Sequence, residues 1–262
     1  MHPATVDDHQ KNVNMHHTNA AIVTGGGSGI GLAIASKFVA EGKKTIIIGR
    51  NQAKLDDAAK TLGSLCVTVQ ADLTDLPAMP QLVQSIISTH GPFDTLVNNA
   101  GINMKKEIQD VSDEDFQTVM HTNVNALFSI SREVIKYWLR ETIGGSIINI
   151  SSMASQYGIP KVIAYTASKT AIDGMTRAMA SELSVHNIRI NSIAPGFIAT
   201  AMSAKALNDD PERMQKVMGR TPMKRLGLPE EVASLAWFLA GSEASFITGT
   251  IIPVDGGNSI GF

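Results

Sequence analysis

The stretch Thr24-Gly25-Gly26-Gly27-Ser28-Gly29-Ile30-Gly31 decides the fold, because it joins an apolar run, Ala20–Thr24, to a helix-like segment, Gly31–Glu41. Glycines permit a tight turn and a close approach of the backbone to a pyrophosphate, whose charge the free N–H groups at a helix start can meet. A strand, a glycine turn and a helix in this order predict a dinucleotide-binding turn. Its expected cofactor-binding residues are Gly25, Gly27, Ser28, Gly29, Ile30 and Gly31.

Outward from this turn, short apolar runs alternate with helix-like segments along the chain. The runs are rich in β-branched residues and lack polar alternation, which is typical of parallel strands buried on both faces. We expect strands at Ala20–Thr24, Thr45–Gly49, Leu65–Gln70, Thr95–Asn98, Gly145–Ile150, Ile188–Ile193 and Thr250–Val254. We expect helices at Gly31–Glu41, Lys54–Leu62, Pro77–Thr89, Asp113–Leu139, Tyr165–Leu183 and Glu230–Leu239. This alternation predicts an α/β fold with a Rossmann-type, doubly wound parallel sheet of about seven strands and helices on both faces.

Residues 20–262 contain no linker, low-complexity tract or change in composition, so we expect a single domain there. Residues 1–19 are polar and hold His2, His9, His16 and His17. Because nothing hydrophobic is available to order this stretch, we expect a flexible N-terminal extension rather than a metal site.

Composition narrows the class of protein. The formal net charge of −2 gives no indication of a nucleic-acid or membrane-surface partner, which would usually need a clustered basic face. No run approaches the roughly 20 apolar residues needed to span a bilayer, and residues 1–19 lack the apolar core of a secretory signal. The single Cys66 is compatible with a reducing compartment, so we expect a cytoplasmic protein. His90, His121 and His186 are isolated, so we expect no bound metal.

The end of the second expected strand bears on the coenzyme. A site that prefers NAD usually places Asp or Glu here to bind the ribose 2′-hydroxyl. Gly49 offers no carboxylate, whereas the guanidinium of Arg50 suits a phosphate. We therefore expect Arg50 and Asn51 to bind NADP, with NAD as the alternative. A solvated arginine at a strand end is the competing interpretation of Arg50.

Tyr165 and Lys169 lie four residues apart in a predicted helix, so their side chains share one face. A tyrosine can exchange a proton with a carbonyl or alcohol oxygen, and a nearby ammonium favours its phenolate form. The same spacing occurs at Tyr157 and Lys161, but the glycine and proline between those two make a helix there improbable. Tyr165 and Lys169 are therefore the candidate proton-transfer pair of a nicotinamide-dependent oxidoreductase.

Taken in order, the motifs resemble those of the short-chain dehydrogenase/reductase family, in its single-domain branch of about 250 residues. The likeness covers nearly everything from Ala20 to Gly257. Besides the glycine turn it rests on Asp72, Asn98-Asn99-Ala100-Gly101, Asn123, Ser152, Tyr165-Thr166-Ala167-Ser168-Lys169, Pro195-Gly196 and Val254-Asp255-Gly256-Gly257. The resemblance implies an NAD(P)-dependent enzyme that acts on CH–OH groups and interconverts a secondary alcohol and a ketone.

The resemblance also implies roles for single residues. Ser152 would hydrogen-bond the substrate carbonyl beside Tyr165, and Lys169 would also bind the nicotinamide ribose. Asn123 would hold a water through its backbone and complete a proton relay, and Asp72 would bind the adenine. The other coenzyme-binding residues would be Leu73, Asn98, Ala100, Gly101, Pro195, Gly196, Ile198 and Thr200. The substrate would contact Ser152, Met153, Tyr157, Tyr165, Phe197 and Met202. Some NADP-preferring relatives carry a basic residue where Ser28 stands, which leaves the coenzyme choice to Arg50.

The resemblance leaves the substrate open. The motifs are similar to those of sugar, polyol and keto-acid dehydrogenases of the gluconate 5-dehydrogenase type. The alternative is a 3-oxoacyl-carrier-protein reductase, which would need a basic docking patch; the candidate residues are Lys105, Lys106, Lys205, Lys224 and Arg225. A more remote alternative is a non-catalytic NADP-binding regulator, although such a protein would not need Asn123, Ser152, Tyr165 and Lys169.

Two further expectations concern assembly and motion. The resemblance implies a homotetramer, with interfaces from the segments Asp113–Leu139, Tyr165–Leu183 and Thr250–Val254. Residues 200–222 are expected to form a mobile lid over the substrate.

Overall fold

The computed structural model describes residues 20–201, 203 and 211–261. Among these residues, seven strands form one sheet in the order β3-β2-β1-β4-β5-β6-β7, and every neighbouring pair is parallel. The strands are β1 (Ala20–Thr24), β2 (Lys44–Gly49), β3 (Cys66–Gln70), β4 (Thr95–Asn98), β5 (Gly145–Ile150), β6 (Ile188–Pro195) and β7 (Ile251–Val254). The predicted doubly wound sheet is confirmed, and the strand ends differ from the expected ones by at most two residues.

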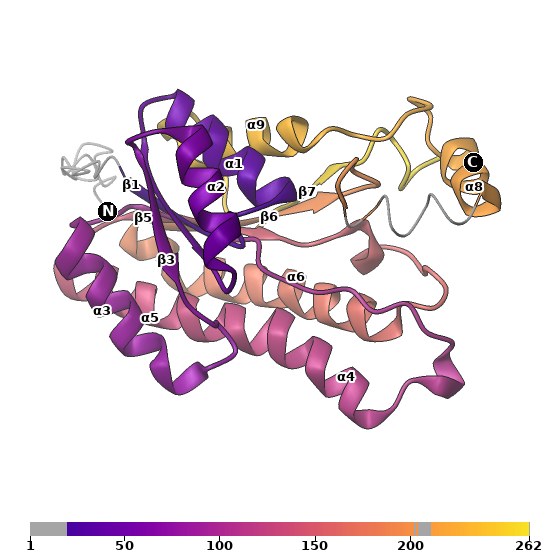
Figure 1. Ribbon diagram of the computed structural model, residues 1–262, viewed down its shortest axis with the longest axis horizontal. Helices are drawn as coiled ribbons and strands as arrows, with labels where there is room; N and C mark the ends of the chain where they lie inside the picture. The colour runs from indigo at the N-terminus through magenta and orange to yellow at the C-terminus, as the bar shows by residue number, and fades with distance from the viewer. Residues whose placement is uncertain (1–19, 202, 204–210, 262) are drawn as a thin grey trace, which may run out of the picture.

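Helices cover both faces of this sheet (Figure 1). One face carries α1 (Gly29–Ala40), α2 (Gln52–Leu62) and α9 (Pro229–Ala240). The other carries α3 (Met79–His90), α4 (Asp113–Met120), α5 (Ala126–Glu141) and α6 (Ile163–Leu183). A further helix, α8 (Pro211–Arg220), lies near the carboxyl ends of β6 and β7.

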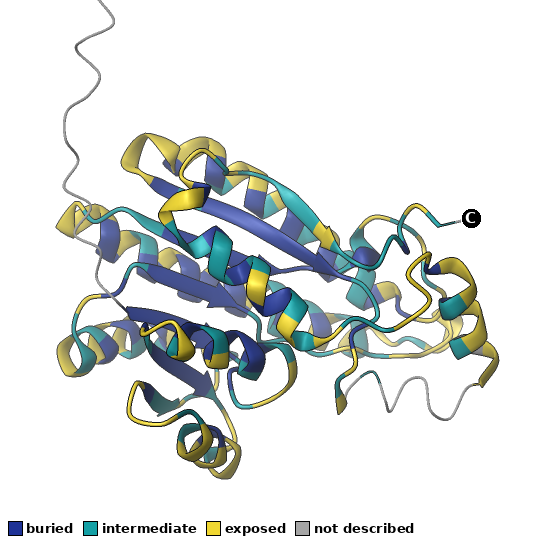
Figure 2. Ribbon diagram, turned by 90° about the horizontal axis from the view of Figure 1, so that it is seen from above, coloured by how far each residue is buried: buried dark blue, intermediate teal, exposed yellow. Residues whose placement is uncertain are grey.

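The burial pattern explains why the strands carry no polar alternation. Successive side chains of a strand point to opposite faces, and both faces of this sheet are covered. Val23 and Ile47 belong to the core under α1 and α9, whereas their neighbours Ile22 and Ile46 belong to the core under α3 and α5. All four side chains are fully buried. Figure 2 shows the strands as a buried layer and the outer helix faces as exposed.

The strand order locates the functional site. β1 pairs with β2 on one side and with β4 on the other. The chain therefore leaves β1 in one direction, returns to the middle and continues the other way. At such a switch point the connections after the two strands diverge and leave a crevice at their carboxyl ends, where ligands of open α/β sheets bind.

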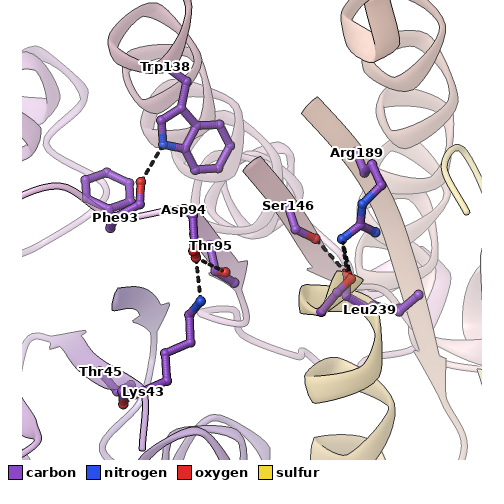
Figure 3. A network of polar contacts seen from close by, with 10 residues as sticks. Lys43, Thr45, Phe93, Asp94, Thr95, Trp138, Ser146, Arg189 and Leu239 are labelled. Carbon is purple, nitrogen blue, oxygen red and sulfur yellow. Dashed lines mark hydrogen bonds and ion pairs between the residues drawn. The ribbon is translucent and has the colours of Figure 1, made fainter. Parts of the chain in front are cut away.

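Polar contacts fasten the opposite, amino edge of the sheet (Figure 3). Lys43, just before β2, forms an ion pair with Asp94, just before β4, at 2.5 Å. Near the starts of β5 and β6, Ser146 and Arg189 both donate to the carbonyl oxygen of Leu239 at the end of α9, at 2.9 and 2.8 Å. None of these contacts involves the carboxyl ends of the strands, where the crevice lies.

Two helix predictions need correction. The expected single helix Asp113–Leu139 is α4, a π-helical turn (His121–Asn125) and α5, because the backbone widens by one residue per turn around Asn123. The segment Pro211–Arg220, predicted only as part of a lid, is helix α8. The predicted N-terminal extension, Met202 and residues 204–210 of the expected lid lie outside the described residues.

Candidate active site

The glycine turn forms the floor of the site between β1 and α1. Gly25 and Gly29 have φ angles of +65° and +55°, which L side chains rarely adopt. A Cβ atom on Gly31 would lie 2.3 Å from the carbonyl oxygen of Gly25. The first N–H groups of α1 have no intrahelical acceptor, and the side chain of the N-cap residue Ser28 does not bind them. The turn therefore fits a pyrophosphate.

Asn99 belongs to the Asn98–Gly101 turn, which the resemblance assigned to supporting the central strands and contacting the coenzyme, but it was given no role of its own. In the structure Asn99 braces the glycine turn: its side-chain amide donates to the carbonyl oxygens of Thr24 and Gly25, at 3.0 and 3.2 Å. Its backbone N–H donates to the Thr24 hydroxyl at 2.9 Å. β1 and β4 are thus tied together where the crevice opens.

A cavity of about 360 Å³ lies in this crevice. It brings together most of the predicted residues: Gly25, Ser28, Gly29, Ile30, Ala100, Gly101, Ser152, Met153, Tyr165, Lys169, Pro195, Gly196, Phe197, Ile198 and Thr200. Apolar side chains that the sequence analysis did not assign complete one wall: Ile102, Ala154, Ile159 and Val162. Ala154 lies in a single 3-10 turn and the others in loops, where hydrophobic periodicity gives no signal.

The predicted adenine-side residues lie outside this cavity but along the same edge of the sheet. Arg50 and Asp72 follow β2 and β3, and both are exposed. Hydrogen bonds from Thr74 lower the pKa of the Asp72 carboxyl, and the positive charge of Arg50 lowers it further. Leu73 follows Asp72 and is half-buried. The Asn51 side chain caps α2 by accepting from the Lys54 N–H at 3.0 Å, so its side-chain oxygen is occupied by a structural contact.

Two predicted residues are bound to other parts of the protein. Asn98 is buried, and its amide donates to Ser131 Oγ at 2.8 Å and to Asn149 Oδ1 at 2.9 Å, so its side chain joins β4, β5 and α5. The Tyr157 hydroxyl donates to Asn258 Oδ1 at 2.5 Å, and its ring lies 4.2 Å from the Arg220 guanidinium. Tyr157 is not among the residues that line the described cavity.

The candidate proton-transfer group combines β5 and α6. Ser152 follows β5, and Tyr165 and Lys169 occupy successive turns of α6. The Lys169 ammonium donates to the carbonyl oxygen of Ile150 at 2.7 Å and lies 5.5 Å from the centre of the Tyr165 ring. The segment with the same spacing at Tyr157 is not helical, as the glycine and proline predicted.

Burial dominates the electrostatics of this group. It raises the pKa of the Tyr165 phenol, and the hydrogen bond to Ser152 acts in the opposite direction. Burial also lowers the pKa of Lys169 to about 8, while the negative charge of Asp173 raises it. The pKa of Tyr165 thus moves opposite to the direction expected from a neighbouring ammonium, because burial outweighs the hydrogen bond to Ser152. In this arrangement Tyr165 keeps its proton and can donate it.

Asn123 lies in the π-helical turn and is buried. Its amide donates to Ser168 Oγ at 3.0 Å, one residue before Lys169. A Cβ atom on Gly101 would come within 3.1 Å of Asn123 Oδ1 and 3.8 Å of Lys169 Nζ. Glycine at this position therefore keeps open the space in front of the lysine.

The described residues form neither a metal-ligand cluster nor a membrane-spanning helix. No group of three or more histidine, cysteine, aspartate or glutamate side chains in this part of the chain is placed to hold a metal ion. No helix within the described ranges is long and apolar enough to cross a membrane.

Comparisons with known proteins agree with this geometry. A family model described as enoyl-(acyl carrier protein) reductase matches residues 25–259. The chain is 37% identical to a 3-oxoacyl-[acyl-carrier-protein] reductase of Thermotoga maritima, covering 90% of this chain and 96% of the relative. It is 38% identical to an NADP-dependent (R)-specific alcohol dehydrogenase of Lentilactobacillus kefiri, covering 90% and 95%.

A solved structure extends the comparison. The protein comes from Beutenbergia cavernae, is identified provisionally as an NAD(P)-dependent gluconate 5-dehydrogenase, and was solved with NADP bound at low occupancy. It is 37% identical to this chain, with a TM-score of 0.85 over 92% of this chain and 97% of its own.

Proposed function

The chain belongs to the short-chain dehydrogenase/reductase family of oxidoreductases, and we propose that it uses NADP to interconvert an uncharged ketone and its secondary alcohol. The observation that carries this proposal is the convergence of Ser152, Tyr165 and Lys169 on one cavity that also borders the glycine turn. A nicotinamide coenzyme bound there supplies the hydride for reduction and accepts it for oxidation.

The residues of this chain supply the proton. In reduction, Ser152 Oγ donates a hydrogen bond to the carbonyl oxygen and stabilises its developing negative charge. Tyr165 transfers its hydroxyl proton to that oxygen, and the ammonium of Lys169 stabilises the phenolate left behind. The Asn123 side chain is held by Ile102 and Ser168, so its part in a proton relay would fall to its backbone carbonyl. Oxidation runs the same steps backwards.

Arg50 supports NADP as the coenzyme. It stands exposed at the carboxyl end of β2, where a 2′-phosphate would lie, and Gly49 beside it offers no carboxylate for a 2′-hydroxyl. The relative from Lentilactobacillus kefiri is named NADP-dependent, and the Beutenbergia cavernae structure holds NADP. Steady-state rates with NADPH and NADH test the choice; a preference for NADH would reject it.

The cavity wall supports an uncharged substrate. The cavity that Ser152 lines is also lined by Met153, Ile159, Val162 and Phe197. Burying a carboxylate against such side chains without a partner is costly. This favours a neutral alcohol, sugar or polyol over a keto acid, although relatives named gluconate 5-dehydrogenase exist.

A matched pair of substrates tests this point. Ethyl acetoacetate and acetoacetate carry the same ketone and differ in the charge of the neighbouring group. We expect kcat/KM with NADPH to be at least about tenfold higher for the ester. A factor of ten corresponds to a cost of about 1.4 kcal/mol for burying the carboxylate of acetoacetate. A preference for acetoacetate would reject the uncharged substrate and leave the reaction type standing. Absence of turnover across a wide panel of carbonyls and alcohols, with tight NADPH binding, would instead favour the regulator.

The second candidate is a 3-oxoacyl-carrier-protein reductase, favoured by the relative from Thermotoga maritima. Its carrier would need free cations beside the cavity. Three of the candidate cations are engaged within the chain: Lys106 pairs with Asp115 at 2.6 Å, Arg225 pairs with Glu231 at 2.6 Å, and Lys224 donates to the Gly219 carbonyl. Lys205 lies outside the described residues. A much higher kcat/KM for acetoacetyl-carrier protein than for a short acetoacetyl thioester would establish this function.

A homotetramer and a cytoplasmic location remain part of the proposal. Large apolar side chains are exposed on α5 and α6 at Phe128 and Ile163, and beyond α9 at Phe246. Such exposed groups suit contacts between copies. Sedimentation equilibrium of the pure protein decides the assembly, and a monomer at micromolar concentration would reject it.

A further inference from the structure

Helix α6 carries a buried carboxylate that the mechanism above does not use. Asp173 follows Lys169 by four residues, as Lys169 follows Tyr165, so the three side chains lie one above another on a single helix face. Lys169 and Asp173 are only 5% and 6% exposed. Charged residues are seldom buried to this extent unless they are paired.

The two charged groups reach the same place on the sheet. Lys169 Nζ donates to the carbonyl oxygen of Ile150. Ser192 Oγ lies 3.3 Å from Asp173 Oδ1 and 3.2 Å from the carbonyl oxygen of Asn149, the residue before Ile150. Ser192 is also the register partner of Asn149 across β5 and β6. The carboxylate and the ammonium therefore lie over consecutive residues of β5.

The neighbouring polar groups at this place are neutral. The Asn149 side chain accepts a hydrogen bond from Asn98 and donates one to Thr176 Oγ1. All three side chains are uncharged. The amide of Asn123 donates to Ser168 on the other side of Lys169. None of these groups carries a charge, so none can balance the charge of Lys169.

The titratable groups on elements packed against α6 are directed elsewhere. On α4, Asp113 and Glu114 are exposed, and the half-buried Asp115 pairs with Lys106. His121 of the π-helical turn contacts the carbonyl oxygen of Thr74. Arg189 of β6 donates to carbonyls at the end of α9, and His186 is exposed. Within the described residues, Asp173 is therefore the anion placed to act on Lys169, and its charge raises the pKa of that lysine against the effect of burial.

We propose that Asp173 is a positioning residue that acts on Tyr165 through Lys169, by holding the buried lysine in its charged form at β5. Only a charged lysine can stabilise the phenolate that remains after Tyr165 has donated its proton. The link to catalysis rests on the proposed function, but the effect on Lys169 does not.

The direct test is the titration of Lys169 in coenzyme-free protein labelled with ¹³C at the lysine ε-carbons, followed by NMR. Lys169→Met identifies the signal. In Asp173→Asn we expect Lys169 to lose its proton at a pH lower by roughly one unit, as for the removal of a nearby opposite charge. A purely structural role predicts the opposite, since disruption of the buried site would move the titration up towards the ordinary lysine value of about 10.4. An unchanged or raised titration would overturn the proposal.

The pH profile of reduction is the second readout. We expect kcat of Asp173→Asn to fall about tenfold near pH 9 and to change little near pH 6, because one pKa unit is a factor of ten in the charged fraction. Asp173→Glu, which keeps the charge, should restore most of the wild-type profile. An equal loss at both pH values would reject the proposal.

Matched variants complete the design. Glu182→Gln removes an exposed carboxylate from the same helix and should leave both readouts unchanged. Ser192→Ala removes the contact but keeps the carboxylate, so the titration of Lys169 should stay close to that of wild type. If Asp173→Asn does not fold, Asp173→Leu removes the charge without leaving an unpaired amide. An inactive wild-type enzyme would reject the proposed function, while the NMR titration would still decide the role of Asp173.

Discussion

Asn123 and Ile102 exchange two hydrogen bonds. The Ile102 N–H donates to Asn123 Oδ1 at 2.8 Å, and Asn123 Nδ2 donates to the Ile102 carbonyl oxygen at 2.9 Å. With its third bond, to Ser168, the side chain fastens the loop after β4 to the helix that carries Tyr165 and Lys169. It does so from a π-helical turn, a feature that is frequent at functional sites.

Replacing Asn123 with alanine should therefore damage both stability and catalysis. The substitution leaves buried partners without a hydrogen bond, so we expect a loss of about 2–4 kcal/mol in the free energy of unfolding. Urea denaturation followed by circular dichroism measures this loss. A variant as stable as wild type would show that these bonds do not hold the site together.

Gly31→Ala should disrupt the glycine turn, because the new Cβ would lie 2.3 Å from a backbone oxygen that has no room to move. We expect failure to bind NADPH, measured by fluorescence titration, and a lowered melting temperature. Gly27→Ala is the matched control for stability, since its Cβ would meet its nearest neighbour at an ordinary 3.5 Å. Equal melting temperatures for the two variants would contradict this account of the turn.

Arg50→Ala should reduce the preference for NADPH. Loss of a charge-assisted contact to a phosphate costs about 1.5–3 kcal/mol, so we expect the KM for NADPH to rise at least tenfold while the KM for NADH changes little. Lys60→Ala, which removes an exposed cation from the end of α2, is the control. A parallel rise for both coenzymes would show that Arg50 does not recognise the 2′-phosphate.

Lys43→Met should destabilise the sheet from the edge opposite the site. It leaves Asp94 largely buried without its partner, and breaking such a pair costs roughly 3 kcal/mol. Urea denaturation checks the loss, and kcat at 25 °C should stay near that of wild type because the ion pair precedes β2 and β4, at the opposite edge of the sheet from the cavity. A normal free energy of unfolding would show that the pair contributes nothing net.

The sequence predicted the parts of this molecule that depend on local pattern. Buried runs such as Ile46–Ile48 revealed the strands because both faces of a parallel sheet are covered. The proline and glycine after Tyr157 predicted, for an equally local reason, that Tyr157 and Lys161 do not share a helix face, and the segment is not helical.

What the sequence did not predict depends on contacts between distant segments. The π-helical turn around Asn123 has no periodic signature in the sequence. It accompanies hydrogen bonds from Asn123 to Ile102 and Ser168, which lie in distant segments. Burial raises the pKa of Tyr165, and the helical spacing of two residues does not indicate how deeply they are buried. The burial of Asp173 likewise depends on β6, whose Ser192 lies far from it in the sequence.

The most direct test of the account is the turnover of Tyr165→Phe, measured beside its NADPH affinity. The substitution removes one hydroxyl and keeps the ring that lines the cavity. The account predicts NADPH binding within about twofold of wild type and a kcat lowered by at least 10²-fold, the usual contribution of a general acid. Substantial turnover by this variant would contradict the assignment of Tyr165 as the proton donor.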